Sequence, residues 1–245
     1  MAEPATPSQP AALTAGRIDV WLAAPRTLEA EEEQRALGLL SDDERLRWRR
    51  FARQASRDQY LAAHVVLRKA LSRYVDAPAN AWRFGANAYG RPHVLEPSGA
   101  PLDFNLSHTE GLVAVAVSGA RDIGVDVENV SRDADLEQLA AAFFAKAEAE
   151  AVELANAADK RETFFALWTL KEAYIKARGM GLSLGLDGYA FDISADAPAI
   201  AFDDRCTDDP GRWRFWRFRP TPLHALALAA PSHVEEARII WTDVG

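Results

Sequence analysis

Cysteine is almost absent from this sequence, which contains a single one, Cys206, among 245 residues. One thiol excludes a framework of internal disulfides and favours a reducing compartment. Long apolar runs are also missing, so no membrane span is expected. The first residues lack the basic segment and apolar core that mark a secretory signal peptide. These absences together predict a soluble, cytoplasmic protein.

An excess of positive charge is missing as well. Lysine and arginine number 28 against 36 aspartate and glutamate residues, which gives a net charge of −8. A general binder of nucleic acids or membrane surfaces would present a basic field, so this balance argues against both classes. Hydrophobic residues make up 49% of the chain, enough for the core of one large domain or two small ones.

The order of the expected elements divides the chain into two halves. Residues 1–16, rich in Ala, Pro, Thr and Ser, predict a disordered tail. The order strand, helices, strands then occurs twice, over residues 17–122 and 123–245, although no internal repeat is visible. Five further strands are expected near the C-terminus: Tyr189–Ile193, Ile200–Phe202, Trp213–Arg219, Ala225–Ala229 and Arg238–Trp241.

The stretch Phe164–Leu184 carries two polar groups suited to chemistry. Its periodicity predicts an amphipathic helix, which begins at a capping box of Asp159 and Glu162 and ends at a glycine. Glu172 and Lys176 are neighbours on one face of this helix, just beyond a group of aromatic rings. Taken alone, such a pair is more often a surface ion pair than a functional site.

A second stretch, Ile123–Val130, changes that interpretation. As a strand it places Asp126 and Glu128 on one face, roughly 6.6 Å apart along the chain, and two valines on the other. Two carboxylates about 6 Å apart repel by about 3 kcal/mol at an effective dielectric constant of about 20, so in an apolar setting they need a cation. Together with Glu172 they form an all-oxygen set that suits Mg²⁺.

Three more polar groups lie at the ends of expected strands. Ser107 and His108 end the first of two strands expected over Asp103–Ser118, a place where functional groups are often displayed. Arg91 lies between a glycine and a proline, which predicts a turn. A Ser-His pair that stood alone would more often be structural.

An arginine-rich helix is expected from a capping box of Ser41 and Glu44 to about Arg53. It contains Arg45, Arg47, Arg49, Arg50 and Arg53. Such a run is often only a solvated face. In an acidic protein it also indicates an anionic partner, and both interpretations stay open from the residues alone.

Taken in order, the motifs resemble the Sfp-type 4′-phosphopantetheinyl transferase family. The resemblance extends from about Val20 to Phe191. It rests on Gly90-Arg91-Pro92, Phe104–His108, Gly124–Glu128, Phe143-Phe144 and Trp168–Lys176. Each motif alone is weak, but their common order and approximate spacing are specific.

The resemblance implies an α+β fold in which two similar α/β subdomains are related by a pseudo-twofold axis, with the active site at their seam. It implies a Mg²⁺-dependent transfer of the 4′-phosphopantetheine arm of coenzyme A to a serine of an apo acyl or peptidyl carrier protein, with release of 3′,5′-ADP. The expected enzyme is a monomer with no nucleic-acid or membrane partner. Its carrier is expected to be acidic, because the arginine helix offers local basicity in an acidic chain.

Residue by residue, the resemblance assigns metal ligation to Asp126, Glu128 and Glu172. Glu172 is also the expected base for the incoming serine hydroxyl. Lys176 and Lys171 are expected phosphate contacts, and Lys176 is expected to neutralise the leaving bisphosphate.

The other coenzyme A contacts implied by the resemblance are Ser107, His108, Arg91 and Arg47. His108 and Arg47 are expected at the 3′-phosphate. The sequence departs from the family there, because Glu44 and Gln59 occupy positions at which relatives carry basic residues, although Arg57 is close enough to compensate. Two other functional classes stay open: a coenzyme A-binding regulator without turnover, and a Mg²⁺-dependent nucleotide phosphohydrolase.

Overall fold

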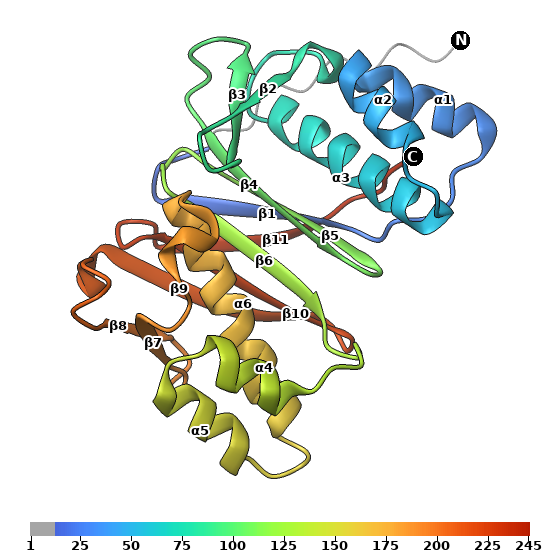
Figure 1. Cartoon of the computed structure of the whole chain (residues 1–245). Helices are drawn as coiled ribbons and strands as arrows, with labels where there is room; N and C mark the ends of the chain where they lie inside the picture. The colour runs from blue at the N-terminus through green and yellow to red at the C-terminus, as the bar shows by residue number, and fades with distance from the viewer. Residues whose placement is uncertain (1–12) are drawn as a thin grey trace.

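The computed structural model describes residues 13–245, so the disordered tail predicted for residues 1–16 lies mostly outside the described residues. The described chain has an α+β fold, which confirms the predicted class (Figure 1). No helix among the described residues has the length and apolar character needed to cross a membrane.

The first half places helices on one face of a β-sheet. Its elements are β1 (Arg17–Ala23), α1 (Ala30–Leu39), α2 (Asp42–Arg49), α3 (Gln54–Ser72), β2 (Arg83–Ala86), β3 (Pro92–Glu96), β4 (Asp103–Thr109) and β5 (Leu112–Ser118). β4, β5 and β1 are antiparallel neighbours, and β2 and β3 form a separate hairpin. Ala63, Leu67 and Ala70 form an apolar stripe on α3 and are buried in the core beneath the helix.

The second half is built in the same manner, with helices against a three-stranded antiparallel sheet in the order β6-β10-β9. Its elements are β6 (Gly124–Asn129), α4 (Leu136–Phe143), α5 (Lys146–Leu154), α6 (Lys160–Arg178), β7 (Tyr189–Asp192), β8 (Ala199–Phe202), β9 (Trp213–Thr221), β10 (His224–Pro231) and β11 (Glu236–Trp241). α6 contacts β6 and β10, while β7 and β8 form a hairpin beside it.

Three apolar clusters separate the layers of the molecule. One lies between α3 and the first sheet, and another lies between α6 and the second sheet. The third lies between the two sheets, where Val20 and Ala114 of the first pack with Val125 and Leu228 of the second. The order of layers is therefore helices, sheet, sheet, helices, as Figure 1 shows.

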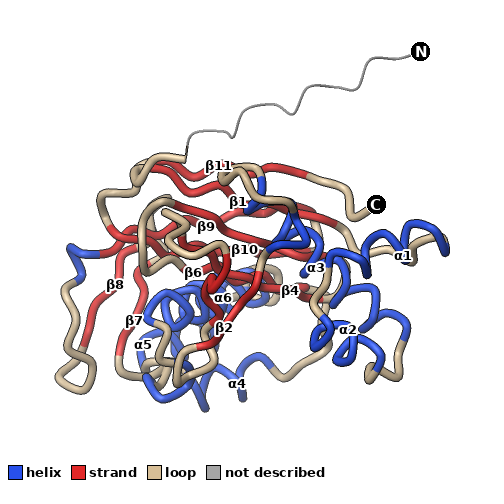
Figure 2. The backbone as a smooth tube through the Cα atoms, turned by 90° about the horizontal axis from the view of Figure 1, so that it is seen from above, coloured by secondary structure: helices blue, strands red, loops and turns tan. Residues whose placement is uncertain are grey.

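The last strand crosses from the second half into the first sheet. β11 lies beside β1 (Figure 2) and pairs with it in parallel, which gives the sheet order β11-β1-β5-β4. Val244 is buried in the core beneath α3, and Lys69 donates to the carbonyl oxygens of residues 244 and 245. The predicted division at residues 122 and 123 therefore leaves out one feature, because the chain after residue 235 packs with the first half.

Two helix ends differ from those expected. The capping box of Ser41 and Glu44 is present, but α2 ends at Arg49 and Arg53 has an extended backbone as the N-cap of α3. Asp159 is the N-cap residue of α6 as predicted, but the predicted capping box does not form, because the Asp159 carboxylate makes no capping bond and accepts from Asn156 instead.

Candidate active site

The site is built where α6 packs directly on the start of β6. Gly124 makes this approach possible, because a Cβ there would lie 2.0 Å from the Ala173 carbonyl oxygen and 2.6 Å from the Ala177 nitrogen. Glu172 and Lys176 flank this contact on the helix, and Asp126 follows it on the strand. Any other residue at position 124 would push α6 away from β6 and would thus separate Glu172 from Asp126.

Lys176 and Asp126 form the centre of the site. The Lys176 ammonium donates to Asp126 Oδ1 at 2.7 Å and to Ser107 Oγ at 2.8 Å. The Ser107 hydroxyl in turn donates to Asp126 Oδ1 at 2.9 Å. The Lys176 side chain stays 26% exposed, whereas that of Asp126 is 7% exposed. The structure thus brings together three of the predicted site residues, from β4, β6 and α6.

Two more carboxylates belong to the same electrostatic group. Burial raises the pKa of Glu172, and the Asp126 and Glu128 carboxylates raise it further. Burial and the Asp126 carboxylate likewise raise the pKa of Glu128, and Lys176 opposes the rise at both glutamates. Each group is harder to ionise because it is buried and because other carboxylates lie nearby, and an added cation would relieve both effects.

As they stand, no three His, Cys, Asp or Glu side chains between residues 13 and 245 form a group that could hold a metal ion. One observation nevertheless fits a cation. Asp126 Oδ2 is buried and has no hydrogen-bond partner within the described chain. A buried carboxylate oxygen without a partner is costly, and oxygen donors of this kind are the ligands that Mg²⁺ prefers.

A pocket of about 270 Å³ opens beside this centre, between the two halves of the molecule. The first half contributes the β2–β3 turn and β4, including Tyr89, Arg91 and Asn105, while the second half contributes Glu172 and Lys176 from α6 and two glycines after it. A small molecule in the pocket would therefore touch both halves of the chain and the face of α6 that carries Glu172 and Lys176.

Arg91 lies in the pocket wall, but its guanidinium is already engaged. It donates to the Ala177 carbonyl oxygen at 2.8 Å and to that of Lys176, and it forms an ion pair with Asp103 at 2.7 Å. The last carbonyls of a helix lack partners within the helix and favour a cation, so Arg91 caps the C-terminus of α6 from the first half of the chain. The position of Arg91 near the site agrees with the prediction, and its main contacts are to protein rather than toward the pocket.

Lys171 does not fit the phosphate contact predicted for it. Its side chain is fully buried, pairs with Glu148 at 2.7 Å, and donates to the carbonyl oxygens of Leu186 and Tyr189. The sequence contained a signal for this position, because Lys171 shares a helical stripe with Phe164 and Ile175, which are also buried. The residue belongs to the core of the second half.

His108 and Arg47 do not line the pocket of about 270 Å³ beside Lys176. His108 is exposed and follows Ser107 on β4, so the two side chains point to opposite faces of the strand. Desolvation and the nearby Lys176 lower the pKa of His108. Arg47 is exposed and lines a second pocket, of about 520 Å³, with Arg50 and Phe51.

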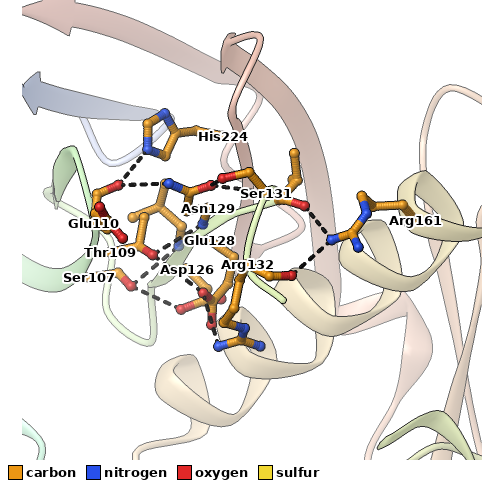
Figure 3. A network of polar contacts seen from close by, with 12 residues as sticks. Ser107, Thr109, Glu110, Asp126, Glu128, Asn129, Ser131, Arg132, Arg161 and His224 are labelled. Atoms are coloured by element: carbon orange, nitrogen blue, oxygen red, sulfur yellow. Dashed lines mark hydrogen bonds and ion pairs between the residues drawn. The ribbon is translucent and has the colours of Figure 1, made fainter. Parts of the chain in front are cut away.

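Sequence reasoning overlooked a row of side chains that joins the two subdomains. Asn105, Ser107 and Thr109 of β4 accept hydrogen bonds from the backbone nitrogens of Val125, Val127 and Asn129 in β6, at 2.9, 3.3 and 3.1 Å (Figure 3 shows Ser107 and Thr109). The two residues of each pair are 20 positions apart in the sequence, as they would be between parallel strands. Side-chain oxygens of β4 therefore accept the hydrogen bonds that backbone carbonyls accept in a parallel sheet. Polar residues at every second position of an otherwise apolar strand were the available signal.

Glu44 and Gln59, the two residues that depart from the family at the predicted 3′-phosphate region, both contact other residues of this chain. Glu44 pairs with the fully buried Arg68 at 2.5 Å, and Gln59 donates to the Thr109 carbonyl oxygen. The negative charge of Glu44 is thereby compensated inside the first subdomain.

Comparison with known proteins identifies both halves. A family model for the 4′-phosphopantetheinyl transferase superfamily matches residues 122–230, and a model for a 4′-phosphopantetheinyl transferase N-terminal region matches residues 25–120. The boundary between these matches lies next to the predicted division of the chain.

Individual relatives match over long stretches. The chain is 30% identical over 215 residues to the 4′-phosphopantetheinyl transferase Sfp of Bacillus subtilis, which spans 88% of this chain and 93% of that protein. It is 36% identical over 145 residues to the 4′-phosphopantetheinyl transferase HetI of a Nostoc species, covering 59% of this chain and 61% of that protein. Another Bacillus subtilis 4′-phosphopantetheinyl transferase is 29% identical over 171 residues, 70% of this chain and 74% of its own length.

Proposed function

Because this chain belongs to the 4′-phosphopantetheinyl transferase family, we propose that it transfers the 4′-phosphopantetheine arm of coenzyme A to a serine of an apo acyl or peptidyl carrier protein, releasing adenosine 3′,5′-bisphosphate. The observation that carries the proposal is the Lys176–Asp126–Ser107 centre beside a pocket that both subdomains line. Transfer between two substrates needs such a shared site, since positioning and charge neutralisation are the main requirements of phosphoryl chemistry.

In this proposal Glu172 acts as the base and Lys176 neutralises the leaving group. Glu172, which lines the pocket beside Lys176, takes the proton of the carrier serine as the hydroxyl oxygen attacks the phosphorus next to the pantetheine arm. The P–O bond to the leaving bisphosphate then breaks. Lys176, one helical turn away, neutralises the charge that remains on the leaving phosphate.

Asp126, Glu128 and Glu172 would hold Mg²⁺ in the proposed enzyme. The buried Asp126 Oδ2 without a described partner and the raised pKa values of the two glutamates support this assignment. When bound, the cation supplies charge neutralisation at the pyrophosphate of coenzyme A.

For the rest of coenzyme A we propose the seam pocket, with Ser107 close to the phosphates. His108 and Arg47 remain the proposed contacts of the 3′-phosphate, because both are exposed and neither is held in an ion pair between described residues. Arg91 contributes by fixing the end of α6, which carries Lys176.

The carrier is proposed to be acidic. Arg47, Arg49, Arg50 and Arg53 are all exposed at the end of α2 and the start of α3, in a chain whose net charge is −8. A basic patch of this kind would attract an acidic partner that the rest of the surface repels. We further propose that the enzyme acts as a monomer in the cytoplasm.

The pseudo-twofold relation of two similar subdomains is also a proposal. It is supported by α3 and α6, which are both 19 residues long and each lie against a largely antiparallel sheet. The two sheets then face each other through a common apolar layer.

Intact-mass measurement of several apo carrier proteins, incubated with coenzyme A, Mg²⁺ and this enzyme, tests the proposal. We expect a phosphopantetheine adduct on at least one acidic carrier, and none on a variant whose acceptor serine is alanine. Release of phosphate or phosphopantetheine without any carrier would instead support a phosphohydrolase. Binding of coenzyme A without an adduct on any carrier would support a regulator.

A further inference from the structure

The hydroxyl groups of β4 make the same two contacts with β6 at two successive positions. Ser107 Oγ accepts from the Val127 nitrogen at 3.3 Å and donates to the carboxylate of the preceding residue, Asp126, at 2.9 Å. Two residues further on, Thr109 Oγ1 accepts from the Asn129 nitrogen at 3.1 Å and lies 3.5 Å from Oε2 of the preceding residue, Glu128. Figure 3 shows both hydroxyls beside the two carboxylates.

We infer that Thr109 is a positioning residue for Glu128, orienting its carboxylate toward the cation as Ser107 orients that of Asp126. This inference rests on the proposed function, in which Glu128 is a metal ligand. A hydroxyl that is fixed by a backbone nitrogen can direct its own proton only toward the remaining acceptor, which here is the carboxylate. Residues that hydrogen-bond a ligating carboxylate set its orientation and thereby the affinity of the site.

Thr109 and its neighbour Glu110 are together held by contacts from three elements. Its carbonyl oxygen accepts from Gln59 of α3 at 2.5 Å. The carbonyl oxygen of its neighbour Glu110 accepts from Asn129 at 3.3 Å and bonds to the ring of His224 at 2.8 Å. The turn that carries Thr109 is therefore fixed to α3, β6 and β10, and a rigid support is what orientation of a ligand requires.

Two other side chains contact the Glu128 carboxylate, and one of them is Trp168 of α6, whose hydrogen bond opposes the rise that burial causes in the pKa of Glu128. The second is Arg132, which is 3.6 Å away on a side chain that is 42% exposed, where ion pairs restrict geometry weakly. The Glu128 side chain is 17% exposed. The Thr109 hydroxyl is thus the contact that comes from the rigid, buried side of the strand pair.

The competing explanation is that Thr109 only ties the two sheets together. Thr221 provides a matched control, because its hydroxyl also accepts from a backbone nitrogen, that of Leu223 at 3.1 Å, and bonds to a side chain, His224, at 2.7 Å. It belongs to the same network but touches no carboxylate of the site. Replacing threonine by valine keeps the shape and deletes the hydroxyl at either position.

The experiment measures Mn²⁺ binding by electron paramagnetic resonance, with coenzyme A and without carrier, together with the melting temperature of the metal-free protein. We expect Thr109→Val to weaken Mn²⁺ binding about tenfold or more, and Thr109→Ser to restore it, because serine keeps the hydroxyl. Thr221→Val should lower the melting temperature by about as much as Thr109→Val, on the order of 2–4 °C, while leaving Mn²⁺ binding unchanged.

Equal Mn²⁺ affinity in Thr109→Val and the parent, with lowered stability, would overturn the inference and leave Thr109 a tether. Equal losses of affinity in Thr109→Val and Thr221→Val would also overturn it, because the effect would then follow from the network alone. Absence of Mn²⁺ binding in the parent would overturn the metal centre itself, and the inference with it. Transfer in the parent, measured in parallel, separates that outcome from a failure of the proposed function.

Discussion

At the scale of single residues, Asp126 interacts with all the other charged groups of the site: Lys176, Glu128 and Glu172. Its Oδ1 accepts from Lys176 and Ser107, and its charge raises the pKa of both nearby glutamates. A change that keeps the shape of Asp126 but removes its charge therefore separates catalysis from folding.

We predict that Asp126→Asn lowers transfer by about 100-fold or more while leaving the metal-free protein as stable as the parent or more so. The loss of one anion relieves the two glutamates, and Lys176 keeps both of them as partners. Thermal unfolding without metal and the rate of carrier modification are the two measurements. A variant with low stability and normal transfer would show that Asp126 is structural.

Lys171 allows a second prediction at this scale, because it lies in a family motif but is buried. Lys171→Met leaves the Glu148 carboxylate buried without its partner, so we expect a loss of about 3–5 kcal/mol in the free energy of unfolding. Adding Glu148→Gln removes the uncompensated charge and should recover part of that loss. The Michaelis constant for coenzyme A should stay unchanged in the double variant, measured well below its melting temperature; a large increase would restore the phosphate role.

At the scale of elements, the C-terminus of α6 contacts a residue from the first half of the chain. Arg91 reaches it from the β2–β3 turn and is held in place by Asp103. The tight approach is possible because Gly179 ends the helix in a left-handed conformation with φ of 62°, and a Cβ there would lie 2.8 Å from Arg91 Cδ.

We predict that Arg91→Met destabilises the protein by about 3–5 kcal/mol, because it removes the cap and leaves Asp103 without its partner in a largely buried position. The turnover number should fall as well, since Lys176 lies in the last turn of α6. Adding Asp103→Asn should recover stability but not turnover. Arg83→Met, at an exposed position of the same hairpin, is the control and should change neither quantity.

A histidine of α3, His64, gives a prediction for pH dependence. His64 of α3 stacks on Tyr60 with ring centroids 4.0 Å apart, and burial lowers its pKa from 6.5 to about 4. Between these values the unfolded chain binds the proton and the folded chain does not, so stability falls as the pH drops from 6.5 toward 4.

The expected loss from His64 is at most about 3 kcal/mol across this range. His64→Phe keeps a ring beside Tyr60 but cannot titrate, so its stability should depend less on pH over the same interval. Urea unfolding at several pH values between 4 and 7 measures the difference. Identical pH profiles for the variant and the parent would assign the acid sensitivity to carboxylates instead.

At the scale of the whole molecule, the distribution of charge decides how partners approach. The described surface combines a net negative chain with exposed arginines concentrated around residues 47–53. Arg49 ends α2 and Arg53 precedes α3, so they are not the pair on one helix that a single continuous helix would have produced.

We predict that Arg49→Glu/Arg53→Glu slows association with an acidic carrier and weakens the dependence of this rate on salt. The double variant shifts the net charge by four units, from −8 to −12. The Michaelis constant for coenzyme A should change little. Arg205→Glu/Arg238→Glu makes the same charge change elsewhere on the surface, so an equal effect of both variants would show that net charge alone, rather than this patch, is responsible.

The sequence by itself determined the strand and the helix that carry the acidic residues, and the face of each on which these residues lie. Alternation along residues 123–130 placed Asp126 and Glu128 on one side of a strand, and the periodicity of residues 164–178 placed Glu172 beside Lys176. Both features are confirmed in β6 and α6. They are local, because the direction of a side chain within a strand or helix follows from its nearest neighbours in the chain.

Only the tertiary structure decided which partners the long basic side chains reach. Lys176 meets Asp126 across 50 residues, and Arg91 meets the end of α6 across 85. Lys171 and Lys176, five residues apart on one helix, end in the core and at the pocket respectively. The addition of β11 to the first sheet likewise depends on its pairing with β1, which lies more than 200 positions earlier in the sequence. Such contacts depend on how the layers pack, and no local pattern in the sequence records that arrangement.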